Sequence, residues 1–339
     1  MSSWYRAHQQ LGAGAEFDII RALLAQWGDL AVDIGDDAAV LGATDRAHRV
    51  ISTDACVEHV HFQRAWIPPR AVGTRAVAAA LSDLAAMGAR ADSLLLSFIV
   101  PDAWRGALTD IAFGVADVAR ATGARIIGGN LSRGDTFSLT TTAIGSADRV
   151  VSRDGAQPGD VLLLTGRLGG PSQAIRAWMD GREPSAWERA RFCAPVARLA
   201  EGQALASAGA RAMIDISDGI VAEAQHIAAA SRVILELDAG SLPRGEQVTV
   251  DDALASGEEY ELLAVVPADA LSALLASWTS RHDTPLTVVG RVFANNAETL
   301  ASHSPLNGVR VRGRSRDDSP ARITGGHVEF NAGHDHFSR

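Results

Sequence analysis

An alternation of strand-like and helix-like segments runs through most of this chain and constrains its fold more than any other feature. From residue 48 onward, β-branched or aliphatic runs are followed by Ala-rich stretches with helical spacing. In the first half the pattern predicts strands over 48–55 and 93–100, helices over 71–89 and 103–123, and strands in RIIGG and FSLTTTAIG. Gly123 is expected to end the second helix. We therefore expect an α/β protein, of the α+β type.

A polar segment over 148–160 separates this alternation from a second one. It contains Gly155, Pro158 and Gly159, a composition typical of a joint between domains. The second series predicts strands over 161–166, 212–217, VILELD and YELLAVV, and helices starting at PSQAIRAWMD and over 218–231.

The length of the chain favours two domains. Its 339 residues exceed what one hydrophobic core usually organises. We place the N-terminal domain at 1–149 and the C-terminal domain at 150–315. The polar, Gly-containing remainder, 316–339, is expected to be a loosely packed tail.

The chain contains no lysine, so all 31 of its basic residues are arginines. A P-loop and a protein kinase each need a lysine to reach the nucleotide phosphates, and Schiff-base chemistry needs a lysine amine. These classes are excluded, and any phosphate chemistry must use other groups.

Charge and hydropathy exclude further partners. The formal net charge of −9 argues against a nucleic-acid surface. The sequence has no apolar run of the ~20 residues that a membrane-spanning helix needs. The N-terminal stretch lacks the pattern of a secretory signal, so we expect a cytoplasmic protein. Cys56 and Cys193 lie far apart in sequence and favour neither a disulfide framework nor a thiolate zinc site.

Several aspartates fall where an apolar run stops or inside an apolar helix. Each one separately fits an ordinary role, as a turn residue, a cap or a residue in a first helical turn. Together they are expected to converge at the mouth of an α/β sheet, where their mutual repulsion requires hard cations such as Mg²⁺. Such ions bind phosphate oxygens, which suits phosphoryl transfer by a chain without lysine. The aspartates are Asp36, Asp37, Asp54, Asp83, Asp215 and Asp218.

Two Gly-rich segments, 126–130 and 165–170, are predicted to be turns that follow strands. Their backbone amides could cradle a phosphate, although each signal alone is weak.

A series of motifs across nearly the whole chain resembles the thiamine-monophosphate kinase family, within the superfamily that includes aminoimidazole ribonucleotide synthetase. LSDLAAMGA and IDISDGI are the most specific of them. The others are EFDII, GDDAAV, STDACVEHVHF, GGNLSRG, SRDGAQPGDVLLLTG, SGEEYELL, VVGRV and GHDHF, in the family's order.

The resemblance implies a biosynthetic transferase that converts thiamine monophosphate and ATP to thiamine diphosphate by direct in-line transfer, without a phosphoenzyme and with several Mg²⁺ ions. It also implies a homodimer whose mixed-sheet N-terminal domains form a barrel across the dimer, with a C-terminal tail that contributes to the substrate site. The residues that match metal ligands are Asp37, Ser52, Thr53, Asp54, Asp83, Asn130, Asp215 and Asp218. Asp83 and Asp218 would act in catalysis by positioning metal.

The remaining matched positions belong to the two substrates. Those matching nucleotide contacts are Gly129, Asn130, Arg153 and Ser217, and those matching thiamine phosphate contacts are His61, Glu258 and His334. From the residues alone, Arg153 equally fits a solvated surface charge and His61 a structural histidine. Glu258, Glu259 and Glu261 equally fit the exposed side of a strand.

The sequence departs from the family pattern at four positions. Asn130 stands where the family has Asp in GGD, so a neutral carbonyl replaces a charged ligand and is expected to coordinate more weakly. His59 replaces a glycine, and Glu259 replaces an aspartate. His334 replaces a larger aromatic residue and offers a smaller stacking face.

Two alternative functions remain open from the sequence. One is a sister ATP-dependent synthetase of the same superfamily; the relatives that need an N-terminal cysteine with a lysine, or a reactive C-terminal cysteine, are disfavoured because this chain has neither. The other is a sensor that binds nucleotide or thiamine phosphate without turnover, with Asn130 and His334 as marks of lost catalysis.

Overall fold

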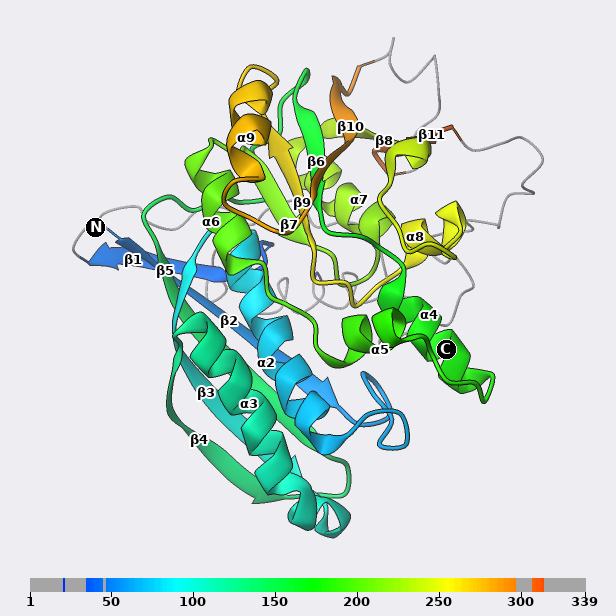
Figure 1. Ribbon diagram of the computed structural model, residues 1–339. Helices are drawn as coiled ribbons and strands as arrows, with labels where there is room; N and C mark the ends of the chain where they lie inside the picture. The colour runs from blue at the N-terminus through cyan, green and yellow to red at the C-terminus, as the bar shows by residue number, and fades with distance from the viewer. Residues whose placement is uncertain (1–20, 22–34, 45–46, 297–306, 314–339) are drawn as a thin grey trace.

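Two β-sheets, one above the other in Figure 1, organise this computed structural model, which describes residues 21, 35–44, 47–296 and 307–313. The first sheet has the strand order β1-β2-β5-β3-β4. Only β3 and β4 pair in parallel, so the sheet is mixed, and within the described residues it does not close into a barrel. Its strands are β1 (Ala39–Thr44), β2 (Ala47–Val57), β3 (Arg90–Val100), β4 (Arg125–Arg133) and β5 (Ser138–Ala147).

The second sheet has the order β11-β8-β10-β6-β9-β7. Here β8 and β11 are parallel and the other pairs are antiparallel. Its strands are β6 (Val161–Thr165), β7 (Ala212–Asp215), β8 (Val233–Asp238), β9 (Leu262–Val266), β10 (Leu286–Ala294) and β11 (Val309–Arg312). The α/β prediction is confirmed in its coarse form, a mixed α/β chain with two sheets.

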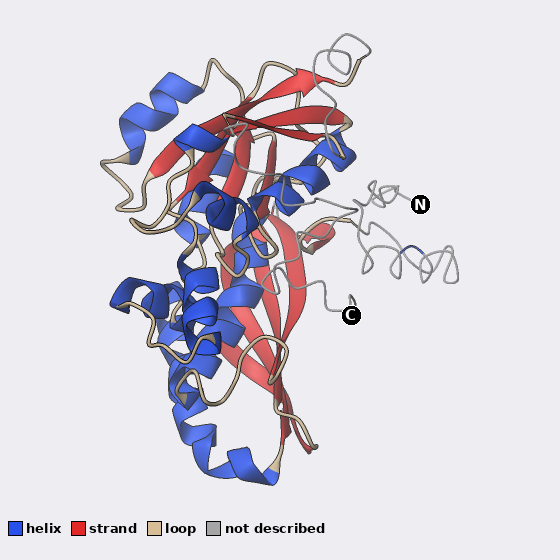
Figure 2. Cartoon of the chain, turned by 90° about the vertical axis from the view of Figure 1, so that its right-hand side faces the viewer, coloured by secondary structure: helices blue, strands red, loops and turns tan. Residues whose placement is uncertain are grey.

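Helices pack on one face of the first sheet and around the second (Figures 1 and 2). The first sheet carries α2 (Pro69–Ala86) and α3 (Leu108–Thr122), with a 3₁₀ turn, η2 (Asp102–Ala107), before α3. None of the named helices covers its opposite face (Figure 2). The second half of the chain also contains α4 (Gly170–Met179), α5 (Ala186–Cys193), α6 (Leu199–Ser207), α7 (Ile220–Ser231), α8 (Val250–Ala255) and α9 (Leu271–Trp278), with the short 3₁₀ turn η3 (Ala239–Ser241). Of these, α7 packs on β7 and β8, whereas α5 and α6 contact α2.

Helix α2 is the element that joins the two halves. It packs on β2 and β5 of the first sheet and also contacts β7 and α6 of the second half. Its Ala-rich sequence suits this position, because small side chains let neighbours approach on every side, and most of its residues are buried. At the crossing with α3, a Cβ on Gly73 would lie 2.1 Å from the Ile111 carbonyl oxygen, so only glycine allows this contact. One hydrophobic core cluster consequently runs from Val50 of the first sheet to Met213 and Leu262 of the second.

The predicted elements and the observed ones agree in place for most of the chain. The helix expected over 103–123 consists of η2 followed by α3, and it ends at Gly123 in the left-handed conformation. The segment 126–130 lies inside β4, which confirms the strand predicted at RIIGG and shows that the prediction of a turn there is wrong. None of the described helices is long and apolar enough to span a bilayer. The predicted tail 316–339 lies outside the described residues.

Candidate metal and nucleotide site

Three carboxylates from distant parts of the chain meet between the two sheets. Asp37 precedes β1, Asp83 lies in the last turn of α2, and Asp215 ends β7. One oxygen of each lies within 4.8 Å of the others. The packing of α2 against both β2 and β7 brings them together.

Burial and mutual repulsion make this acidic cluster costly. Burial is the main cause of the raised pKa values of Asp83 and Asp215, and the neighbouring carboxylates add to it. Two unit charges ~4 Å apart repel by about 4 kcal/mol at an effective dielectric near 20. The carbonyl end of α2 is a further unfavourable place for the charge of Asp83. A proton or a cation would therefore stabilise the acidic cluster, and an oxygen-only donor set fits a hard divalent cation.

Strand β2 supplies the second part of the site. The Ser52 hydroxyl donates a hydrogen bond to the Asp83 carboxylate. Asp54 is close enough to raise the pKa of Asp83 further, and one of its oxygens accepts from the Ala55 amide at 2.7 Å. Side chains alternate along a strand, so Thr53 points to the opposite face, where its hydroxyl lies 3.1 Å from that of Thr142. The Thr53 side chain is thus outside the acidic cluster.

Arg153 binds the acidic cluster directly. Its guanidinium donates two hydrogen bonds, of 2.8 and 3.0 Å, to the two carboxylate oxygens of Asp37. Its backbone amide donates to Asp36 at 2.8 Å, yet burial still raises the pKa of Asp36 to about 7. The side chain of Arg153 is only 14% exposed, so its interpretation as a solvated surface charge is wrong.

The turn after β7 carries Ser217 and Asp218, and the side chain of Glu223 from α7 contacts this turn. One Glu223 oxygen accepts from the Ser217 amide, the Ser217 hydroxyl and the Asp218 amide, at 3.3, 3.1 and 3.0 Å. Burial, followed by the charge of Asp218, raises the pKa of Glu223 to about 8. Glu223 is not among the residues predicted from the sequence, although a carboxylate among the apolar residues of that predicted helix carries the same signal as Asp83.

Gly129 and Asn130 lie away from the acidic cluster, on the edge strand β4. Strands β5 and β3 separate β4 from β2, which amounts to three strand spacings, or about 14 Å. The Asn130 amide donates to Ser132 at 3.0 Å. A Cβ on Gly129 would lie 1.8 Å from the Leu96 carbonyl oxygen, so strand pairing alone requires this glycine. The nucleotide and metal roles of both residues remain predictions.

The predicted substrate residues already have partners within the chain. The Arg75 guanidinium donates to Glu258, and the Tyr260 hydroxyl donates to the same oxygen at 2.9 Å. His61 accepts at Nδ1 from the Val57 amide at 3.0 Å. Their roles toward thiamine phosphate stay predictions, and His334 lies outside the described residues.

Glu259 and Glu261 are buried, so the interpretation of this segment as an exposed strand side is wrong. Arg191 and Arg198 provide their ion pairs. The segment 165–170 wraps these carboxylates, and the Gly169 amide donates to Glu259. That amide is therefore engaged inside the protein and not offered to a phosphate.

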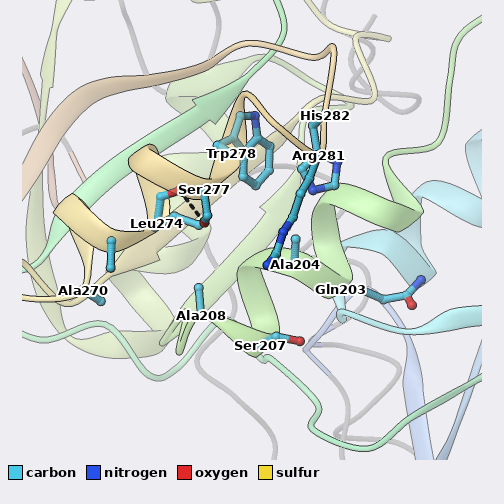
Figure 3. A pocket seen from close by; sticks show the side chains of 11 residues that line it. Gln203, Ala204, Ser207, Ala208, Ala270, Leu274, Ser277, Trp278, Arg281 and His282 are labelled. Carbon is cyan, nitrogen blue, oxygen red and sulfur yellow. Dashed lines mark hydrogen bonds between the residues drawn. The ribbon is translucent and has the colours of Figure 1, made fainter.

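A separate cavity of about 420 Å³ opens between α6 and α9, lined in part by Gln203, Trp278, Arg281 and His282 (Figure 3). The Trp278 and His282 rings pack 4.4 Å apart. None of the predicted site residues lines this cavity.

Comparisons with known proteins place this chain in a defined class. The model of the AIR synthase related protein N-terminal domain matches residues 35–147, and that of the corresponding C-terminal domain matches residues 157–302. A thiamine-monophosphate kinase of Mycobacterium tuberculosis is 37% identical over 257 residues, covering 74% of this chain and 76% of the relative. One from Halobacterium salinarum is 36% identical and covers 81% of this chain and 92% of its own length.

Solved structures agree. The structure of AaThiL complexed with AMPPCP and TMP superposes with a TM-score of 0.76 at 27% identity, covering 89% of this chain and 94% of that one. The thiamine-monophosphate kinase of Stenotrophomonas maltophilia K279a has a TM-score of 0.72 at 32% identity and covers 91% and 99%. The chain belongs to the thiamine-monophosphate kinase family.

Proposed function

We propose that this chain transfers the γ-phosphoryl group of ATP to the phosphate of thiamine monophosphate, giving thiamine diphosphate and ADP. The observation that carries the proposal is the convergence of Asp37, Asp83 and Asp215 beside Arg153 in a member of this family. In such a site, charge stabilisation and positioning supply the catalysis, and no lysine is needed.

The proposed transfer is direct and in line. An oxygen of the thiamine monophosphate phosphate attacks the γ-phosphorus, the bond from that phosphorus to the β–γ bridging oxygen breaks, and ADP leaves. The acidic cluster, with Asp54, Asp218 and Ser52, would hold several Mg²⁺ ions, which neutralise charge on the phosphates when bound. Arg153 fixes Asp37 in place, and its planar fork also suits a phosphate oxygen.

The first test is a product assay. Purified protein with ATP, Mg²⁺ and thiamine monophosphate is expected to form thiamine diphosphate and ADP in equal amounts, followed by chromatography. Chelation of Mg²⁺ by EDTA should abolish both products. Without metal ions, the negative phosphates of the nucleotide would face the negative carboxylates of the acidic cluster. Thiamine and aminoimidazole precursors serve as control substrates. Binding of ATP without any product would favour a sensor, and turnover of a control substrate would favour a sister enzyme.

We further propose that two copies of the chain associate through the first sheet. Every residue of β4 is exposed, and the alternation along β3 places Leu95 and Ile99 opposite the buried Leu94 and Leu96, on the sheet face that no named helix covers (Figure 2). Ile127 and Leu131 of the edge strand β4 are also exposed, Leu131 to 66%, and Leu131 shares the face of its partner Phe98. An apolar patch on an unprotected edge strand is typical of an interface. We also propose that residues 1–149 form the domain that dimerises and that residues 150–315 form the second domain.

The dimer proposal predicts the effect of a charged substitution in this patch. Wild-type protein is expected to sediment at twice its 35.6 kDa chain mass. The double variant Ile127→Glu/Leu131→Glu should sediment as a monomer, because burying two new carboxylates is costly. Phe113→Glu, which changes an exposed side chain of α3, is the matched control and should remain dimeric. A monomeric wild-type chain at micromolar concentration would contradict the proposal.

A further inference from the structure

Glu223 is a buried carboxylate that the proposed chemistry does not use. Glu223 is 3% exposed, and in the described part of the chain no arginine lies within ion-pair distance of its carboxylate. A carboxylate in such a place is retained only if hydrogen bonds compensate for its lost hydration. Those hydrogen bonds all come from the turn that carries Ser217 and Asp218.

The local backbone explains why Glu223 is needed there. Helix α7 is preceded by Gly219, which occupies the N-cap position with φ +116° and has no side chain to cap the first turn. A side chain at 219 would be strained, and its Cβ would lie 3.2 Å from the Ala255 carbonyl carbon. Glu223 instead reaches back from the first turn of α7 and accepts from the donors ahead of the helix, as the glutamate of a capping box does.

These hydrogen bonds define what the turn presents on its other side. The Ser217 hydroxyl proton and the Ser217 and Asp218 amides are all directed to Glu223. The other polar groups of the turn, the Ser217 oxygen and the Asp218 carboxylate, are acceptors, and both amides are already engaged with Glu223. Lone pairs without donors suit a hard cation, or a hydroxyl or amino group of a ligand, better than a phosphate oxygen.

We propose that Glu223 is a positioning residue: by taking up the donors of Ser217 and Asp218, it makes their turn an acceptor-only surface that binds divalent cation beside Asp215. The inference rests on the proposed function, because it assigns Glu223 to the same site. The inference adds that this turn binds a cation and does not contact the phosphate groups of the substrates. Glu223 itself touches neither substrate nor metal.

The test compares three substitutions at this position. Glu223→Leu keeps the volume but removes the acceptor, whereas Glu223→Gln keeps an acceptor oxygen without the charge. Glu223→Asp keeps the charge, but its side chain is one methylene shorter, so the carboxylate lies farther from the turn. For each we measure the Mg²⁺ concentration that gives half-maximal rate, kcat, the KM for thiamine monophosphate, and Mn²⁺ binding by electron paramagnetic resonance without substrate.

The leucine variant is expected to need about tenfold more Mg²⁺ and to bind Mn²⁺ correspondingly more weakly, since loss of an outer partner of a metal ligand typically costs 10–100-fold in affinity. Its KM for thiamine monophosphate should be unchanged, and the glutamine variant should lie within about threefold of wild type. The matched control is Glu201→Leu, which removes another buried glutamate, one that accepts from Thr284 at 2.5 Å. It should lower the unfolding midpoint without altering the Mg²⁺ requirement.

Wild-type Mg²⁺ and Mn²⁺ dependence in Glu223→Leu, or an equal change in Glu201→Leu, would overturn the inference. If the leucine variant does not fold, Glu223→Asp decides in the same way: a raised cation requirement supports the role and an unchanged one refutes it. The Mn²⁺ titration needs no turnover. A wild-type chain that binds Mn²⁺ but forms no product would therefore refute the kinase proposal and still decide the role of Glu223.

Discussion

Asp83→Asn is expected to abolish phosphoryl transfer and, in the absence of metal, to make the protein more stable. A neutral amide cannot supply the charge that Mg²⁺ needs at the centre of the acidic cluster. Loss of about 4 kcal/mol of transition-state stabilisation lowers kcat about a thousandfold. Stability changes in the opposite direction, because the substitution removes one of three neighbouring carboxylates that repel one another. We expect a gain of roughly 1–3 kcal/mol in the metal-free free energy of unfolding.

The stability of the metal-free protein is expected to fall as the pH rises, and the pKa of Asp83 explains the direction. The pKa of Asp83 is raised in the folded protein, mainly by burial. In the unfolded chain Asp83 has its ordinary pKa of 3.8 and loses its proton above that pH, whereas the folded protein still holds the proton there. Metal-free wild-type protein should lose stability as the pH rises from that value through the folded pKa, and Asp83→Asn should lose less.

Denaturant unfolding with EDTA and with Mg²⁺ measures both effects. Mg²⁺ should stabilise the wild type and have little effect on Asp83→Asn, since only the wild type binds the ion tightly. Asp218→Asn should also lose turnover while remaining folded. Asp117→Asn, which changes an exposed carboxylate of α3, is the matched control and should behave as wild type. Wild-type rates in Asp83→Asn and Asp218→Asn would refute the metal assignment.

Removal of the Arg75 guanidinium is expected to produce the largest loss of stability. Arg75 lies in α2 with its side chain 3% exposed, donates to Glu258 and to the Phe192 carbonyl, and stacks 3.8 Å from the Phe192 ring. Arg75→Met leaves the Glu258 charge buried without its arginine, although the Tyr260 hydroxyl still donates to it at 2.9 Å. Breaking a buried pair in this way typically costs about 3–5 kcal/mol.

The same helix provides the matched control for this prediction. Arg70 pairs with Asp117 on the surface of α2 and α3, so Arg70→Met should cost at most about 1 kcal/mol. Urea unfolding measures both variants. The double variant Arg75→Met/Glu258→Gln should recover part of the loss, because no unpaired charge remains. An Arg75→Met variant as stable as Arg70→Met would show that the pair does not hold the two halves together.

Local patterns were sufficient to predict many of the elements. The strand over 161–165 and the helix over 220–231 stand where apolar runs and helical spacing indicated. The Gly-rich segment 126–130 was mistaken for a turn, because its glycines serve a close approach between β4 and β3 that no local rule reveals. The buried state of Glu259 and Glu261 was missed for a similar reason: their partners, Arg191 and Arg198, lie some seventy residues earlier in the chain.

The sequence by itself determined the kinds of groups that the site can contain. A chain without lysine, with carboxylates in apolar surroundings and with the family's motifs in order, restricts phosphate chemistry to metal ions and arginine. Only the tertiary structure decided which of these groups meet. Asp37, Asp83 and Asp215 come together because α2 packs against both sheets, Arg153 folds back onto Asp37, and Asn130 lies three strands away. Distances between remote residues depend on long-range packing, which the spacing of residues along the chain does not encode.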